Sequence, residues 1–508
     1  MFGIDINILK FRYRQLERML AYKFATLRND QRIGVVRASP VYLPYPTIFQ
    51  KQLMPDDVFV ALNSRWSSER SPARNVEFYL LKDVFVLAEG LVFNSAGELI
   101  PGTQVGHPDA AIQIAHAELE SILATSQDVV SMPRGVLCKK AGAGNYGHWL
   151  IEMLPKAFLT HRELGLNDWP IIVHTTSVEM YSIIKQSLAV IGISDDLIHV
   201  TDRSPLFFRE LIVINGLTSH SVYISPLVME CMDFIASKAP MGSAERIYVP
   251  RRPATTRDFE HEPQVAKLFG DEGYSETITA NLSFLEQVST FKTAESVIGA
   301  MGAAMSNIAF CRPGTEVVIF GPASARELFF WLLACGRSLH YFEVRCMEVG
   351  DVQGLLPWNR SLQISLSSIK KVIRATCYAR KLPELPIDAL EQPNSQIKLN
   401  VDYLTSSSWA LLFSNSTDCF YNVIFCLDGT ISGYSHHNEQ TWRINSGVLE
   451  FIGAHGLTTW RFDHINMKDG AMQMRSRYLL NSNIAVVLFL QENPRATTEK
   501  KSDETKLL

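Results

Sequence analysis

Residues 282–320 read LSFLEQVSTFKTAESVIGAMGAAMSNIAFCRPGTEVVIF and contain the clearest structural pattern in the chain. An apolar run at 296–300 enters a cluster of glycine and alanine at 299–304, and a second apolar run follows at 316–320. The order strand, glycine turn, helix, strand is typical of half a Rossmann-like unit. Glycines at such a turn let backbone N–H groups approach an anion at the positive end of the helix. The alternative is a tight turn that binds nothing.

Strand and helix patterns also alternate earlier in the chain. Apolar strands at 169–174, 197–200 and 210–215, with a helix near 178–191, predict a first α/β domain with a largely parallel sheet. A strand at 84–93, a tight turn at 94–97 and a return at 98–100 predict a hairpin before it. Changes of texture along the chain predict six segments, which are a basic amphipathic helix (1–32), an α/β domain (33–240), a second, Rossmann-like domain (241–375), a Pro-punctuated linker (376–396), a small antiparallel β-sandwich or barrel (397–492) and a disordered tail (493–508).

The composition is that of an ordinary globular protein, with 47% apolar and 20% charged residues. A formal net charge of −4 gives no reason to expect nucleic acid as a partner. The chain contains no apolar run of membrane-spanning length, and its first residues lack the layout of a signal peptide. Eight cysteines without a Cys-x-x-Cys pair suit buried thiols in a reducing cytosol rather than disulfides or a zinc site. A cytoplasmic location is therefore predicted.

The predicted N-terminal helix is basic, with seven Lys or Arg against three acidic residues in the first 32 positions. Its apolar side chains recur in steps of three and four from Leu9 to Leu27 and so share one face. Such a helix suits peripheral docking at the inner face of an anionic plasma membrane. The alternative is a helix that packs against this chain or a second copy of it.

A glycine-rich loop at 140–145 leads into a helix that starts near Tyr146. His148 and Glu152 are four residues apart and share one helix face. A carboxylate one turn away can hold a histidine in one tautomer, which suits proton abstraction from a hydroxyl group. A structural hydrogen bond is the alternative.

The strand at 246–250 is followed by Arg251, Arg252 and Arg257. Ligands gather beyond the carboxyl ends of strands in doubly wound sheets, and guanidinium groups bind diphosphate oxygens bidentately. The alternative is a solvated basic loop paired with Glu260 and Glu262. Ser283 and Glu286 form a capping box, which is a structural role, and Gln287 is predicted to face the cleft.

Three ordered blocks in the chain resemble glycosyltransferase family 61, whose bacterial members are often labelled capsular polysaccharide biosynthesis proteins. The resemblance covers roughly residues 75–345, and its blocks are Gly144-Asn145-Tyr146-Gly147-His148-Trp149 with Glu152 and Leu154-Pro155, Tyr248-Val-Pro-Arg251-Arg252 with Arg257 and Glu262, and Ser283-Phe284, Glu286-Gln287, Gly299, Gly302-Ala303 and Ser306-Asn307. One position departs from the family, which usually has His where Met301 stands. A thioether cannot make the contacts of an imidazole.

The resemblance implies two Rossmann-like domains of the GT-B type and inversion at the anomeric carbon, with a nucleotide sugar as donor and a glycan or lipid-linked glycan as acceptor. It implies His148 as the base with Glu152 as its orienting partner, and Asn145 and Tyr146 on the acceptor side or in the adjoining loop. The donor-binding set that it implies is Arg251, Arg257, Glu262, Gln287, Gly302, Ala303, Ser306 and Asn307.

No Asp in the chain has another Asp two positions on, so the sequence lacks the usual motif that holds a metal against a donor diphosphate. Arginines and a helix N-terminus can replace that metal, so no metal or cofactor is expected. We thus predict an inverting, metal-independent transferase of surface or capsular polysaccharide or lipopolysaccharide synthesis.

Two other functions remain as alternatives. The first is a non-catalytic carbohydrate-binding or assembly protein on a retired transferase fold, which Met301 favours. The second is a nicotinamide-dependent enzyme, which requires an acidic residue at the end of the strand at 316–320, and that strand ends in Phe320-Gly321. In the β-domain, aromatic and histidine side chains form either a sugar-stacking surface or a core; they are Tyr434, His436, His437, Trp442 and Trp460.

Overall fold

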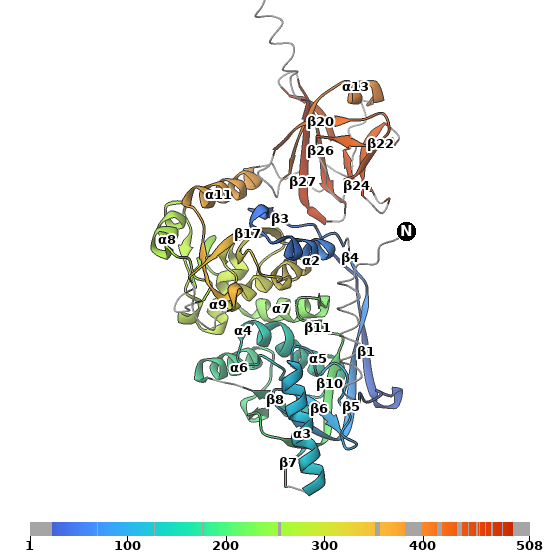
Figure 1. The fold of residues 1–508 in the computed structure, drawn as a ribbon, viewed down its shortest axis with the longest axis vertical. Coiled ribbons are helices and arrows are strands. Elements are labelled where there is room, and N and C mark those ends of the chain that lie inside the picture. Colours follow the sequence, from blue (N-terminus) through green and yellow to red (C-terminus); the bar gives the residue numbers. More distant parts are fainter. Residues whose placement is uncertain are drawn as a thin grey trace, which may run out of the picture.

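The computed structural model places three β-sheets one after another along the molecule (Figure 1). It describes residues 23–68, 70–125, 128–174, 177–251, 256–350, 356–381 and 399–490, the last range with gaps at 414–418, 434–438, 446, 454–455, 457, 463, 469–470 and 480. Most of the predicted N-terminal helix, much of the predicted linker and the predicted tail lie outside these residues, as do Tyr434, His436 and His437. The described end of that helix is not α-helical, because Phe24 forms a β-bridge with Leu99 and a short 3₁₀-helix follows at Asn29–Gln31.

The first sheet is mixed rather than largely parallel. Its order is β1 (Arg32–Ala38), β5 (Arg74–Leu87), β10 (Leu206–Asn215), β7 (Val130–Leu137), β8 (Ile171–His174) and β9 (Ile198–Thr201), with β6 (Leu91–Asn94) on β5. Strands β10, β7, β8 and β9 are parallel, whereas β5 is antiparallel to β1, β6 and β10. The predicted strand at 84–93 is interrupted at 88–90, where Gly90 has φ +106° and lies against the Lys139 carbonyl, so the chain turns earlier than predicted.

The second sheet contains the stretch with which the sequence analysis began. Its order is β14 (Ser275–Glu276), β13 (Arg246–Val249), β15 (Ser296–Ala300), β16 (Glu316–Pro322), β17 (His340–Val349) and β18 (Ser361–Gln363), with β3 (Thr47–Phe49) on β17. All pairs are parallel except β17 with β18. In chain order β14 to β17 read 2-1-3-4-5, so the order reverses between β13 and β15. Open α/β sheets bind ligands beyond the carboxyl ends of strands at such a reversal.

An N-terminal segment joins this second sheet, although the sequence grouped it with the first domain. Strand β3 adds to β17, and α2 (Asp56–Trp66) follows it. The Trp331 indole donates a hydrogen bond of 2.9 Å to the Pro44 carbonyl, and Arg326 pairs with Asp57. The two α/β units are therefore interleaved in the chain.

Helices between the two α/β sheets share one hydrophobic core with both. Figure 1 shows α4 (Tyr146–His148), α5 (Leu154–Leu164), α7 (Pro226–Lys238) and α9 (Phe284–Thr293) at this level of the molecule. The core joins Val136 and Ile212 of the first sheet to Ile247 and Val317 of the second. Other helices of these units are α3 (Asp109–Thr125), α6 (Val178–Val190), α8 (Glu262–Asp271), the 3₁₀-helix η6 (Ala303–Phe310), α10 (Phe329–Arg337) and α11 (Leu366–Lys381).

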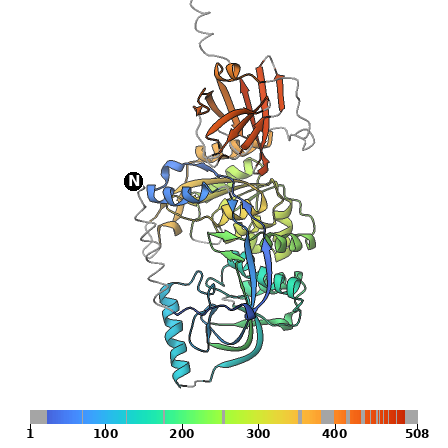
Figure 2. The ribbon, with the colours of Figure 1, turned by 90° about the vertical axis from the view of Figure 1, so that its right-hand side faces the viewer.

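The C-terminal segment forms an antiparallel β-domain, as predicted, at the opposite end of the molecule from the first sheet (Figure 2). Its sheet has the order β21 (Ile431–Ser432), β20 (Cys419–Phe425), β19 (Trp409–Phe413), β27 (Asn481–Leu490), β26 (Ala471–Tyr478), β24 (Thr458–Phe462), β23 (Val448–Ile452) and β22 (Thr441–Asn445), with β25 (His464–Lys468) on β26. Trp442 and Trp460 are buried in its core, where their indoles donate to the Cys426 carbonyl and to Glu439. They pack the domain and do not form a sugar-stacking surface.

In the part of the chain that the structure describes, no helix combines the length and the apolar composition that crossing a bilayer requires.

Candidate functional site

The predicted helix at Tyr146 begins with a side-chain cap and then widens. The Asn145 side chain accepts hydrogen bonds from the Gly147 and His148 amides, at 2.8 and 3.4 Å, and so caps α4 (Tyr146–His148). A π-helical turn follows at Trp149–Met153 and α5 at Leu154–Leu164. Pro155 has no N–H to donate into this turn, and a wider turn accommodates its ring. Such π segments are frequent at functional sites, and this one contains Glu152.

Glu152 lies at the centre of a buried cluster of charged groups. Its carboxylate is 1% exposed, with one oxygen 3.2 Å from His148 Nδ1 and paired with the Lys140 ammonium. The other oxygen lies 2.8 Å from His220 Nδ1. The sequence predicted the pair of His148 and Glu152, and the structure adds Lys140 and His220 to it.

His220 connects this cluster to the second α/β unit. Its Nε2 lies 3.5 Å from the carboxylate of Glu327, which precedes α10, and its ring stacks on Phe329 at 5.2 Å between centroids. Ser221 donates a hydrogen bond to Glu327 from a left-handed backbone conformation with φ +54°. Backbone strain of this kind occurs where a surrounding structure holds a residue for a function. His220 lies in a turn, and no motif or spacing in the sequence marked it as a site residue.

The pKa values of the cluster follow from these contacts. Burial alone raises the pKa of Glu152, but hydrogen bonds from His148 and His220 and the charge of Lys140 outweigh it, so the pKa lies well below its ordinary value. Burial lowers the pKa of His220, but hydrogen bonds to Glu152 and Glu327 and their charges raise it to about 9. At neutral pH, Glu152 is therefore ionised and His220 is a cation held between two carboxylates.

His220 is therefore expected to stabilise the fold in a pH-dependent way. A folded-state pKa of about 9 lies above the ordinary 6.5, so its stabilising contribution is fully present below about pH 6.5 and is lost as the pH rises through about 9. The melting temperature of a His220→Gln variant should fall furthest below that of the wild type at pH 6 and approach it above pH 9.5. The same substitution at exposed His199 of β9 should leave the melting temperature unchanged. If the gap in melting temperature between the wild type and His220→Gln grew with pH, the stabilising role of protonated His220 would be contradicted.

His148 is placed to accept a proton through its second ring nitrogen. When Nδ1–H donates to Glu152, Nε2 carries the lone pair, and the side chain is 23% exposed. Gly142 makes room for this ring, because a Cβ there would lie 2.8 Å from Cδ2 and 3.2 Å from Nε2, and its φ of +80° favours glycine. The glycine-rich loop thus lies directly against the candidate base.

Two arginines gather where the strand order of the second sheet reverses. Arg251 follows β13, and its guanidinium donates to the Thr256 carbonyl at 2.9 Å and to the Thr256 hydroxyl at 3.0 Å. Gly302 follows β15, and a Cβ there would collide with the Arg251 guanidinium. Arg257 has a left-handed backbone with φ +59°, and its buried Nε has no hydrogen-bond partner among the described residues. Both guanidinium groups are only partly exposed.

No carboxylate in the described part of the chain forms an ion pair with Arg251 or Arg257. Burial and the neighbouring Arg257 lower the pKa of Arg251 to about 10, and burial also lowers the pKa of Arg257. Both remain charged at neutral pH. Two adjacent cations that no described carboxylate pairs with can bind an anion, and planar guanidinium groups suit a diphosphate. Glu327 acts on Arg257 through its charge, so the arginines and the Glu152 cluster are neighbours.

Several other predicted site residues are buried and join the two α/β units. Asn307 is 0% exposed; it accepts from the Tyr146 hydroxyl at 2.5 Å and donates to Gln287 at 3.1 Å. Ser306 is also buried, and a Cβ on Gly147 would lie 2.5 Å from its hydroxyl. The sequence placed Gln287, Ser306 and Asn307 against the donor. In this structure they offer no surface to a ligand and instead hold η6 against α4.

Three further positions complete the set. Ala303 is partly exposed at the first turn of η6, where backbone N–H groups lack helical partners. Glu262 accepts from the Tyr248 hydroxyl and the Phe259 amide, which anchors the start of α8 to β13. Met301 is 2% exposed and its methyl group lies against Gly321, so it packs in the core.

His148, Glu152 and His220 offer ligand atoms within 4.8 Å of one another, which is close enough for a metal ion. The Lys140 ammonium pairs with the same carboxylate, however, and His220 is protonated at neutral pH. A metal ligand must be deprotonated, and a cation next to Lys140 would be repelled. The pairing of Glu152 with Lys140 therefore argues against a metal at these residues.

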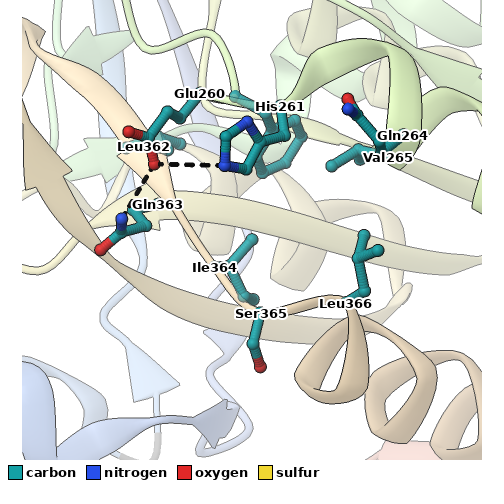
Figure 3. Close-up of a pocket in the computed structure, with 10 residues that line it drawn as sticks. Glu260, His261, Gln264, Val265, Leu362, Gln363, Ile364, Ser365 and Leu366 are labelled. Atoms are coloured by element: carbon teal, nitrogen blue, oxygen red, sulfur yellow. Dashed lines mark hydrogen bonds and ion pairs between the residues drawn. The ribbon is translucent and has the colours of Figure 1, made fainter.

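A hollow of about 200 Å³ lies between the start of α8 and the segment from β18 to α11 (Figure 3). Glu260 accepts from Gln363 at 2.9 Å beside it and lies 3.8 Å from His261. None of the predicted site residues lines this hollow.

Residues 146–318 match the family model Glycosyltransferase 61. The match begins at the helix of His148 and Glu152 and includes Arg251, Arg257 and the turn at Gly302, so the resemblance is confirmed over this range. This part of the chain therefore matches glycosyltransferase family 61, which supports a transferase. No curated protein matches this chain.

Proposed function

We propose that the protein is an inverting, metal-independent glycosyltransferase that moves a sugar from a nucleotide sugar to a glycan or lipid-linked glycan. The observation that carries the proposal is the pair Arg251 and Arg257, with which no described carboxylate forms an ion pair, next to the cluster of His148 and Glu152. The strand order of the second sheet supports a donor site on that unit, and the acceptor would then lie on the first. This assignment corresponds to the two-domain GT-B arrangement.

The proposed reaction is one in-line displacement. His148 Nε2 takes the proton of the acceptor hydroxyl, and the oxygen forms a bond to the anomeric carbon from the face opposite the leaving group. The bond from that carbon to the diphosphate oxygen breaks, and the diphosphate leaves with the electron pair. Arg251, Arg257 and the first N–H groups of η6 neutralise its growing charge. Glu152 keeps Nδ1 protonated, so one base is sufficient for inversion.

The biological setting is part of the proposal. The resemblance favours synthesis of surface or capsular polysaccharide or of lipopolysaccharide, in the cytoplasm or at the inner face of the plasma membrane. Buried Met301 leaves the glycine turn in place, which supports a working enzyme over a retired transferase fold.

The proposal is tested by incubating the full chain with a panel of nucleotide sugars and candidate glycan acceptors. We expect one donor to release its nucleoside diphosphate and NMR to show an inverted anomeric configuration in the product. Binding of nucleoside diphosphates without turnover of any donor would favour the non-catalytic carbohydrate-binding alternative.

Chelation of divalent metals is expected to leave turnover within about twofold of the untreated rate, because two guanidinium groups and a helix N-terminus replace the metal. The measurement is product formation after dialysis against EDTA. Loss of activity that Mg²⁺ or Mn²⁺ restores would contradict the metal-independent mechanism.

A further inference from the structure

A cavity of about 330 Å³ lies in the first α/β unit, beyond the carboxyl ends of β7 and β10. These two strands are parallel neighbours, and the chain that follows each of them lines the cavity. Its volume is at the lower end of the range of roughly 300–1,000 Å³ for ligand pockets. The cavity is distinct from the arginine pair, which lies on the second sheet.

The charged side chains that line this cavity are all cations, namely Arg74, Lys139, Lys140 and Lys156. Two of them have partners elsewhere, since Lys139 donates to Thr201 and the Asp202 carbonyl and Lys140 pairs with Glu152. Neither of the other two, Arg74 and Lys156, forms an ion pair or a side-chain hydrogen bond with a described residue, although the charge of Glu152 acts on Lys156. Arg74 lies over the Tyr223 ring, 4.3 Å from its centroid. Burial lowers the pKa of Lys156, so its charged form is costly there, and an anion in the cavity would offset that cost.

The cavity shares its cationic wall with the proposed catalytic cluster. Lys156 lies one helical turn after Glu152, and Lys140 both lines the cavity and pairs with Glu152. Ser219 also lines the cavity and directly precedes His220. A group bound in the cavity is thus held beside the groups that would deprotonate an acceptor.

We propose that this cavity binds an anionic group of the acceptor, a carboxylate or a phosphate, through Lys156 and Arg74. The inference rests on the proposed function and names the class of acceptor, a glycan that carries a negative charge next to the sugar that is extended. A neutral glycan would leave both cations without a partner, so the same contacts select against it.

Direct binding separates this cavity from the donor site. The probes are glucuronic acid, glucose 6-phosphate and glucose, titrated by NMR into an Arg251→Ala, Arg257→Ala double variant whose donor site is disabled. We expect the two charged sugars to bind and glucose to bind at least tenfold more weakly. The charged sugar that binds more tightly identifies the anionic group as carboxylate or phosphate.

Substitution of the cavity cations then tests the assignment to these residues. Lys156→Met should weaken binding of the charged sugar by about 10–100-fold, the loss expected for one charge-assisted contact. Arg74 is exposed, so Arg74→Gln will fold and should also weaken binding, whereas Lys82→Met on the exposed side of β5 should not. Equal binding of glucose, or unchanged affinity in both cavity variants, would overturn the proposal. These titrations contain no donor, so their outcome does not depend on transferase activity. A failure of the proposed transferase function would appear only in the turnover assay.

Discussion

Replacement of His148 by alanine is expected to reduce turnover by about two to four orders of magnitude while binding of the nucleoside diphosphate survives. The imidazole is the only group in the described Glu152 cluster with a ring nitrogen left free to accept a proton, because His220 is a cation bonded at both nitrogens. The measurements are the rate of product formation at saturating donor and the dissociation constant of the nucleoside diphosphate.

The chain offers a matched control for this substitution. His116 on α3 lies 3.4 Å from Glu120, four residues on, and so forms the same type of pair on a helix of the same unit. His116→Ala should leave turnover unchanged. If His148→Ala turned over at the wild-type rate, His148 would not be the catalytic base.

Loss of the two arginines is expected to have the second large effect. Each guanidinium makes charge-assisted hydrogen bonds worth about 1.5–3 kcal/mol, so Arg251→Ala and Arg257→Ala should each weaken nucleoside diphosphate binding by about 10–100-fold. Arg251→Lys should recover little of it, since an ammonium cannot bind two oxygens as a planar fork does. The measurement is calorimetric titration with nucleoside diphosphates.

Glycine substitutions test the same site without removing a charge. Gly302→Ala places a methyl group where the Arg251 guanidinium lies, so the side chain must move and donor affinity should fall. Gly270→Ala on α8 meets no atom within 4 Å and serves as the control, with unchanged affinity. Arg209→Ala, on the surface of the first sheet, controls for lost positive charge. Donor affinity equal to wild type in Gly302→Ala and both arginine variants would refute the proposed donor site.

Much of the fold followed from local patterns in the sequence. The helix predicted near 178–191 corresponds to α6. Strand β15, the glycine turn and β16 lie where the apolar runs predicted them. The register of the first sheet could not be predicted, because β5 pairs with β10, whose residues lie more than 100 positions further along the chain. Strand β3 was not predicted for the same reason, because its three residues form a strand by pairing with β17, which is distant in the chain.

The candidate site could be predicted from the sequence only where its residues lie on the same helix or strand. His148 and Glu152 lie one turn apart on one helix, so their spacing alone brought them together. Lys140, His220 and Glu327 come from three separate loops, and nothing in the local sequence marks them. The sequence also did not reveal that Asn307 and Gln287 are buried. Their amide groups suit a ligand, but in the structure they bond to each other between η6 and α9.

The single core that both α/β sheets share determines how the protein unfolds. Because Val136 and Ile212 pack in the same cluster as Ile247 and Val317, neither sheet can melt and leave the other intact. Differential scanning calorimetry should show one endotherm for the two α/β units and, since Trp409 and Phe451 belong to a separate cluster, another for the C-terminal domain. Cleavage near residue 240 would yield two fragments that precipitate, whereas the C-terminal domain would survive as a soluble piece.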